Sequence, residues 1–326
     1  MSTACDVSFR SMGSDIRLLI GTPLRPGAIP AAAAGERERA YVEDFAARLS
    51  RFRPDSELSS LNGAPGWEVQ SSPLLRAAVR AGIWAAQMSG GLVDPTLTGA
   101  LERAGYDSSL ERRRPASLEQ ALAAAPPRQG ARPHPARLWS EVSVHDDRCT
   151  IRRPPGVKLD TGGTGKGLCA DAVAHRLRDY SRFVVDCGGD LAIGGVGAQL
   201  DPYDVEVEHP LTGETIRTVR VGCGAIATSG VNVRVWQDAH GGFAHHLLDP
   251  SSGMPAWTGV IGVTALGSSA LEAETLAKMA LLLGERDARR VLSRHGGLIV
   301  RDDGDVHEIG PLDRPHGTLE LTRSAA

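Results

Sequence analysis

The stretch FVVDCGGDLAIGG, residues 183–195, places two adjacent glycines between two short apolar runs. A Gly-Gly pair in this setting predicts a β-hairpin. The segments that follow continue with period-two alternation or with a buried apolar run, both typical of strands. These further predicted strands are YDVEVEH (203–209), TIRTVRVG (215–222), VNVRVW (231–236), GVIGVTAL (259–266) and the closing hairpin LIVRDDGDVHEI (298–309).

Helices are predicted in blocks that are separate from most of these strands. Apolar residues recur every three or four positions over residues 36–52 and 73–88, and helices also fit residues 269–283 and 285–294. One further strand is predicted from Asp15 to Gly21. Helices and antiparallel hairpins in separate blocks indicate the α+β class and not βαβ winding.

The length of 326 residues provides ample material for a sizeable core, and we expect one domain over residues 1–326. Residues 108–140 are rich in Arg, Pro and Ala. They predict a surface excursion that carries one short helix, SLEQALAAA, at residues 117–125.

The composition excludes several classes of protein. With 36 basic and 39 acidic residues the net charge is −3, whereas proteins that bind nucleic acid through its phosphates usually carry a basic excess. There is no run of 18 apolar residues, so we expect no membrane span. The N-terminus lacks a basic start followed by an apolar stretch, so we expect a cytoplasmic protein. Five widely spaced cysteines without a CxxC pair indicate neither a zinc knuckle nor a disulfide framework.

Lysine is scarce in this chain. Three of its 36 basic residues are lysine, namely Lys158, Lys166 and Lys278, and the rest are arginine. A compact ammonium and a planar guanidinium are not interchangeable at a tight site. A lysine kept in such a composition is therefore a candidate functional residue, although we interpret Lys158 as an ordinary surface residue.

The glycine-rich segment LDTGGTGKGLCAD, residues 159–171, is the strongest candidate for phosphate binding. Its backbone N–H groups could approach a phosphate closely, with a helix starting just after the glycines. It is not a P-loop, because Asp160 stands where that motif needs its first glycine and Gly167 where it needs a hydroxyl. A dinucleotide-binding fingerprint is also excluded, since no parallel βαβ unit surrounds the segment. A plain glycine-rich turn remains the alternative.

Four other segments are candidate parts of a site. In AHHLLDPSSGMP (244–255) the two adjacent histidines would point to opposite faces of a strand, so at most one faces a site. The DPSSG sequence also fits a simple turn. The remaining three segments are GAIATSG (224–230), SRFRPDSELSSLN (50–62) and SGGLVDPTLTGAL (89–101).

Taken in order, eight stretches make the chain resemble the ApbE family of flavin transferases, the FAD:protein FMN transferases, from about residue 9 to residue 295. They are FRSMGS, SRFRPDSELSSLN, SGGLVDPTLTGAL, LDTGGTGKGLCAD, VDCGGDLAIGG, ATSG, HHLLDPSSGMP and AETLAKMALLLG. The resemblance implies a T-fold-like α+β architecture with an antiparallel sheet and packed helices. It also implies FAD as substrate, a divalent metal (usually Mg²⁺), and transfer of FMN to a Thr or Ser hydroxyl of a partner flavoprotein with release of AMP.

The same resemblance suggests roles for individual residues. His246 is the candidate base or the residue that orients the pyrophosphate, and Lys166 reads as a clamp on the pyrophosphate or ribose. The other implied contacts with the flavin and nucleotide are Met12, Phe52, Leu92, Val93, Asp94, Asp160 and Leu247.

The chain departs from the family at the implied metal site. The family motif carries Asp and, four residues on, Thr, with a further oxygen from the glycine-rich loop. The corresponding residues here are Glu274, Lys278 and Gly163. Lysine removes an oxygen ligand and adds a positive charge, which does not suit Mg²⁺. We expect the Lys278 ammonium to lie in or beside the metal's space, held by Glu274, with a solvated ion pair as the alternative.

Three functions therefore stay open on the sequence. The first is FMN transfer to a partner flavoprotein. The second is FAD binding with weak or no transferase activity, because the metal site is altered. The third is another flavin or nucleotide reaction.

Overall fold

A computed structural model describes residues 3–106, 116–237 and 241–313 of the chain. Its centre is an eight-stranded antiparallel sheet in the order β1-β2-β6-β7-β10-β15-β16-β17. The strands are β1 (Cys5–Ser11), β2 (Ser14–Ile20), β6 (Phe183–Cys187), β7 (Asp190–Gly194), β10 (Gly224–Gly230), β15 (Val260–Gly267), β16 (Gly297–Arg301) and β17 (Val306–Ile309).

The predicted hairpin at residues 183–195 forms the middle of this sheet. Its strands β6 and β7 pair with Asp186 opposite Leu191, and the turn consists of Gly188 and Gly189. Both glycines have positive φ angles, 65° and 87°. A two-residue turn of this kind matches the twist of antiparallel strands and requires residues that tolerate positive φ.

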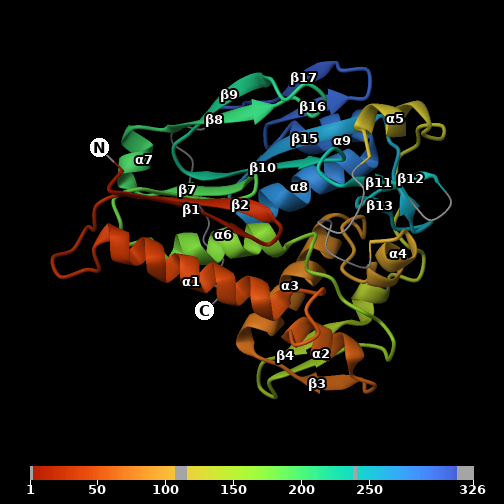
Figure 1. Ribbon diagram of the computed structural model, residues 1–326, viewed down its shortest axis with the longest axis horizontal. Coiled ribbons are helices and arrows are strands. Elements are labelled where there is room, and N and C mark those ends of the chain that lie inside the picture. The colour runs from red at the N-terminus through yellow and green to blue at the C-terminus, as the bar shows by residue number, and fades with distance from the viewer. Residues whose placement is uncertain (1–2, 107–115, 238–240, 314–326) are drawn as a thin grey trace.

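Helices cover one face of the sheet. The helices α1 (Ala31–Leu49), α6 (Gly165–Arg176) and α8 (Ala270–Leu283) contact β1, β6 and β15 respectively, and α6 packs directly on α8. The hairpin of β8 (Tyr203–Glu208) and β9 (Thr215–Val221) covers the opposite face through Val207, Val219 and Val221. Figure 1 shows this arrangement, with α1 and α6 below the sheet and the hairpin above it.

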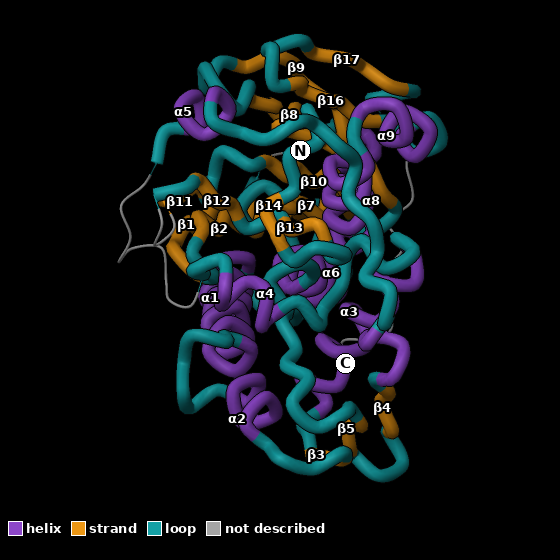
Figure 2. The backbone as a smooth tube through the Cα atoms, turned by 90° about the vertical axis from the view of Figure 1, so that its right-hand side faces the viewer, coloured by secondary structure: helices purple, strands orange, loops and turns teal. Residues whose placement is uncertain are grey.

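The remaining elements surround the ends of these layers. Figures 1 and 2 place α4, β11, β12 and β13 together at one end of the sheet. The full set of remaining elements is α2 (Glu57–Gly63), β3 (Glu68–Gln70), α3 (Pro73–Met88), α4 (Thr98–Arg103), α5 (Leu118–Ala123), η2 (Leu138–Glu141), β4 (Ser143–His145), β5 (Thr150–Arg152), α7 (Val196–Leu200), β11 (Val235–Gln237), β12 (Phe243–His245), β13 (Leu248–Asp249), β14 (Met254–Pro255) and α9 (Glu285–Leu292).

The α+β class and most predicted elements are confirmed. The helix expected at residues 73–88 has those bounds, whereas the helix expected at 36–52 begins at Ala31 and ends at Leu49. The strand predicted at VNVRVW is largely wrong, because residues 231–234 form a turn and β11 starts at Val235.

The Arg-, Pro- and Ala-rich segment contains the short helix that was predicted, as α5. Leu118 and Ala121 of that helix are buried in an apolar cluster with α8 and β15. Residues 108–115 lie outside the described part of the chain, and the single-domain assignment stays a prediction.

Within the described ranges, none of the helices has the length and apolar character needed to cross a bilayer.

Candidate functional site

A cavity of about 810 Å³ lies where the β1–β2 turn, the end of α1, the glycine-rich loop and the start of β13 meet. Such a volume is within the range of small-molecule sites, about 300–1,000 Å³. Eleven of the twelve residues selected from the sequence line it. The twelfth, Glu274, is outside the lining and accepts a hydrogen bond from Lys278. The eleven are Met12, Phe52, Leu92, Val93, Asp94, Asp160, Gly163, Lys166, His246, Leu247 and Lys278.

Lys166 is placed in the cavity by the first turn of α6. Its Nζ lies 2.9 Å from Asp190 Oδ2 and donates a hydrogen bond of 2.8 Å to the carbonyl of Gly188. Asp190 is fully buried at the start of β7. Burial disfavours the ammonium, but the charges of Asp190 and Glu274 outweigh it and raise the pKa of Lys166. Lys166 therefore carries a positive charge at neutral pH.

A second buried ion pair lies on α8. Lys278 Nζ donates to Glu274 Oε1 at 2.8 Å, and the backbone N–H of Gly167 donates to Glu274 Oε2 at 2.9 Å. Glu274 has an exposed fraction of 0% and Lys278 one of 8%, so the pair is not a solvated surface pair. Burial raises the pKa of Glu274, while the neighbouring Lys278 ammonium acts against that rise.

The two ion pairs are close because α6 and α8 approach each other at their N-termini. A Cβ on Gly167 would lie 2.6 Å from the carbonyl oxygen of Ala270, so this crossing requires glycine. The Asp171 carboxylate, on the next turn of α6, accepts hydrogen bonds from the N–H groups of Ala270 and Leu271. Burial raises the pKa of Asp171 to about 7.

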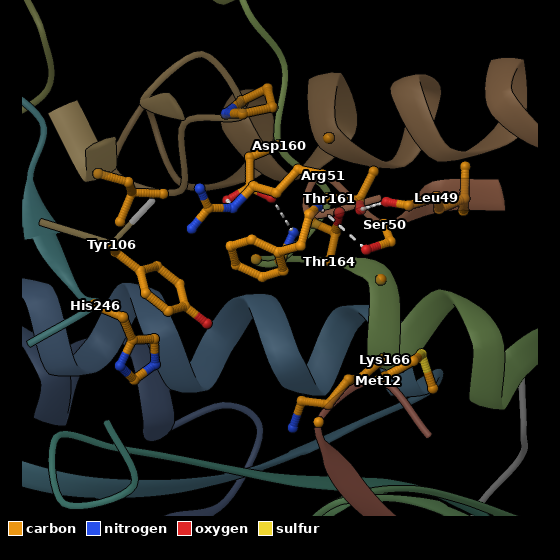
Figure 3. A pocket seen from close by; sticks show the side chains of 18 of the residues that line it. Met12, Leu49, Ser50, Arg51, Tyr106, Asp160, Thr161, Thr164, Lys166 and His246 are labelled. Atoms are coloured by element: carbon orange, nitrogen blue, oxygen red, sulfur yellow. Dashed lines mark hydrogen bonds and ion pairs between the residues drawn. The ribbon is translucent and has the colours of Figure 1, made fainter. Parts of the chain in front are cut away.

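His246 lies between β12 and β13 and is the histidine of the pair that lines the cavity. Burial and, secondarily, the charge of Arg234 lower its pKa well below the usual 6.5, so the ring is neutral at pH 7. Its Nδ1 has no hydrogen-bond partner among the described residues. In Figure 3, His246 and Lys166 lie on one side of the cavity, and Arg51 and Asp160 lie on the other.

His245 takes the opposite orientation, as expected for neighbouring residues at the end of a strand. Its ring meets the edge of Trp257 with centroids 4.6 Å apart, and its Nδ1 accepts the N–H of Leu247. Burial lowers the pKa of His245 to about 4. It is a core residue and does not line the cavity.

One wall of the cavity consists of stacked aromatic and cationic groups. The guanidinium of Arg51 lies 4.3 Å from the ring centroid of Phe52 and 4.5 Å from that of Tyr106. Tyr106 in turn stacks on Trp236, with centroids 5.4 Å apart. Such contacts orient the rings and position the guanidinium near Asp160, whose Oδ2 is 3.7 Å from Arg51 Nε.

Several of these groups were not selected from the sequence. Arg51 neighbours Phe52 in a recognised segment, so its position was a usable signal. Asp190 lies in the recognised segment VDCGGDLAIGG and had the same signal, although its pairing with Lys166 did not follow from it. Tyr106 and Arg234 gave no such signal, because they lie outside the matching stretches and their roles depend on contacts between distant parts of the chain.

The apolar part of the site comes from the segment just after α3 and from Met12 in the β1–β2 turn. The Ser89 hydroxyl accepts the N–H of Val93 and fixes the segment that presents Leu92 and Val93 to the cavity. Asp94 Oδ1 accepts hydrogen bonds from Thr96, whereas Asp94 Oδ2 is buried without a partner among the described residues. Burial raises the pKa of Asp94. Because its Oδ2 has no partner among the described residues, the carboxyl group is able to bind a polar ligand atom.

Residues 1–300 match the model of the ApbE family. The chain belongs to the ApbE family. The FAD:protein FMN transferase of Treponema pallidum (strain Nichols) is 28% identical to it over 310 residues, which cover 87% of this chain and 82% of the relative. The enzyme of that name from Haemophilus influenzae is 24% identical over 284 residues, covering 82% and 78%.

Solved ApbE structures share the fold. The ApbE protein of Thermotoga maritima superposes with a TM-score of 0.75 at 24% identity, covering 94% of this chain and 96% of that chain. The flavinyl transferase ApbE of Pseudomonas stutzeri gives a TM-score of 0.71 at 21% identity, covering 95% and 96%.

The residues at the metal position implied by the ApbE resemblance do not fit a divalent cation. One oxygen of Glu274 is bonded to the Lys278 ammonium and the other to the N–H of Gly167. Lys278 offers no oxygen ligand, and Mg²⁺ needs several oxygens in near-octahedral order. No group of three or more metal-binding side chains occurs in the described part of the chain.

Proposed function

We propose that this ApbE protein transfers FMN from FAD to a Thr or Ser hydroxyl of a partner flavoprotein and releases AMP. The observation that carries the proposal is the convergence of Lys166, Lys278 and the neutral His246 on one cavity. Membership of a family whose curated relatives carry the name FAD:protein FMN transferase supports it.

In the proposed reaction the acceptor hydroxyl oxygen forms a bond to the FMN-side phosphorus of FAD. The bond from that phosphorus to the bridging oxygen breaks, and AMP leaves with the electron pair. The ammonium groups of Lys166 and Lys278 would neutralise charge on the pyrophosphate. The free ring nitrogen of His246 would accept the hydroxyl proton, which its lowered pKa allows at neutral pH.

The walls of the cavity would hold the rest of FAD. We assign the aromatic wall at Phe52, together with the apolar side chains of Met12, Leu92, Val93 and Leu247, to the flat rings of the ligand. Asp94 and Asp160 would accept hydrogen bonds from its polar groups.

Mg²⁺ has no part in this proposal, because Glu274 and Lys278 do not offer it a set of oxygen ligands. The altered pair also favours the second candidate function, FAD binding with slow or absent transfer. A cytoplasmic location and the absence of a nucleic-acid partner stay predictions.

The test incubates FAD with the purified protein and a Thr-bearing acceptor peptide and measures the released AMP by chromatography. We expect release that depends on the peptide and falls at least tenfold in His246→Ala. Bound FAD without AMP release would support the second candidate function instead. The matched control is His145→Ala, which changes a histidine of β4 outside the cavity lining.

A further inference from the structure

We propose that the site binds FAD without a divalent cation, with the ammonium of Lys278 neutralising one charge of the pyrophosphate in the cation's place. The inference rests on the proposed function, since it assumes that FAD is the ligand. It concerns the charge of the site and is independent of which protein accepts FMN.

The first support is the position of the ammonium. Lys278 lines the cavity, is 8% exposed and acts electrostatically on His246, another lining residue, so its ammonium lies near the ligand space and contacts little bulk water. The chain has three lysines among 36 basic residues, and two of them, Lys166 and Lys278, line this cavity. The third, Lys158, forms an exposed pair with Glu102.

The second support is that the pair is held in place from two sides. Glu274 is bonded to Lys278 and to the N–H of Gly167, while Asp171 binds the first N–H groups of the helix that carries the pair. An incoming cation would have to displace the ammonium from Glu274 and compete with two neighbouring positive charges.

The third support is the balance of charge. The buried carboxylates of Asp190 and Glu274 are each paired with one ammonium, that of Lys166 and that of Lys278. These pairs are neutral together before a ligand enters. The guanidinium of Arg234, which lines the same cavity, adds a positive charge beside these two pairs, so an entering pyrophosphate meets cationic groups without any added ion.

The test measures FAD affinity by quenching of flavin fluorescence in EDTA and in millimolar Mg²⁺. We expect the native protein to show the same affinity in both buffers within twofold. Lys278→Thr should bind FAD at least tenfold more weakly in EDTA and recover part of that loss in Mg²⁺. Lys158→Thr is the matched control and should behave as the native protein.

A second readout needs no variant. We expect the electron paramagnetic resonance spectrum of Mn²⁺ to show free ion when the native protein and FAD are added. Stoichiometric Mn²⁺ binding, or native FAD binding that collapses in EDTA, would overturn the inference and leave the proposed function standing. Absence of FAD binding in both buffers would overturn the proposed function and the inference together.

Discussion

The carboxylate of Asp171 on α6 accepts the N–H of Ala270 at 2.7 Å, at the N-terminus of α8. One helix carries Lys166 and the other carries Lys278, so this contact joins the two helices that present the cavity lysines. The second carboxylate oxygen of Asp171 accepts the N–H of Leu271 at 3.0 Å. Two donors of the first turn of α8 are thereby satisfied inside the core.

Asp171→Ala should lower the free energy of unfolding by about 2–6 kcal/mol, because two buried N–H groups lose their acceptor and each costs about 1–3 kcal/mol. Chemical denaturation followed by circular dichroism measures this. Asp147→Ala, at a carboxylate that is 79% exposed, is the control and should change stability by less than about 0.5 kcal/mol. Equal effects of the two substitutions would show that Asp171 does not anchor α8.

Lys166→Ala should weaken FAD binding by about 10- to 150-fold, the loss of a charge-assisted contact of about 1.5–3 kcal/mol. It should also destabilise the fold, because Asp190 becomes a buried carboxylate without its partner. Isothermal titration with FAD and thermal unfolding separate the two effects.

The double variant Lys166→Ala with Asp190→Asn identifies the cause of the lost affinity. We expect stability to recover and FAD affinity to stay low. Recovery of both would mean that Lys166 acts through the fold and does not contact the ligand. Lys158→Ala is the matched lysine control.

The rate of AMP release should not depend on the protonation of His246 from pH 6.5 upward. Burial lowers the pKa of this histidine well below 6.5, so the neutral ring that accepts a proton is present throughout that range. The rate should fall on the acid side, where the ring takes up a proton. A rate that declines as pH falls from 8 to 6.5, and that loses this decline in His246→Gln, would contradict the assignment.

Protonation of His245 should reduce stability in acid. Its pKa is about 4 in the folded protein and about 6.5 in the unfolded chain, so the unfolded chain takes up the proton first as pH falls. The free energy of unfolding should therefore drop by about 3 kcal/mol between pH 6.5 and 4. Chemical denaturation at a series of pH values measures the free energy of unfolding. Its slope against pH should be shallower in His245→Phe than in the native protein, and an unchanged slope would refute the prediction.

Much of the site was predictable because its residues lie in short segments whose local chemistry is distinctive. The glycines before Lys166 and the pair of histidines at 245–246 belong to such segments. The start of α6 at Gly165 and the turn at Gly188 follow from the same local signals.

The aromatic wall and the partner of Lys166 were not predictable in this way. Tyr106 and Trp236 are 130 positions apart, and their stacking depends on the packing of α4 against β11. Asp190 lies in the segment VDCGGDLAIGG, but nothing in the sequence alone pairs it with Lys166.

The error at VNVRVW has a physical cause. Its alternation fits a strand, but the chain leaves the sheet after Gly230 and presents Val233 and Arg234 to the cavity. Val235 then pairs with His245 of β12 and not with a strand of the central sheet. Period-two alternation does not distinguish these two outcomes.

The mass of a Thr-bearing acceptor peptide, measured after incubation with FAD and the native protein, tests the central claim most directly. The account predicts a peptide that gains one FMN group, with an equal amount of AMP, and no gain when Ala replaces the acceptor Thr. A peptide of unchanged mass beside intact, protein-bound FAD would contradict transfer and leave a protein that holds FAD.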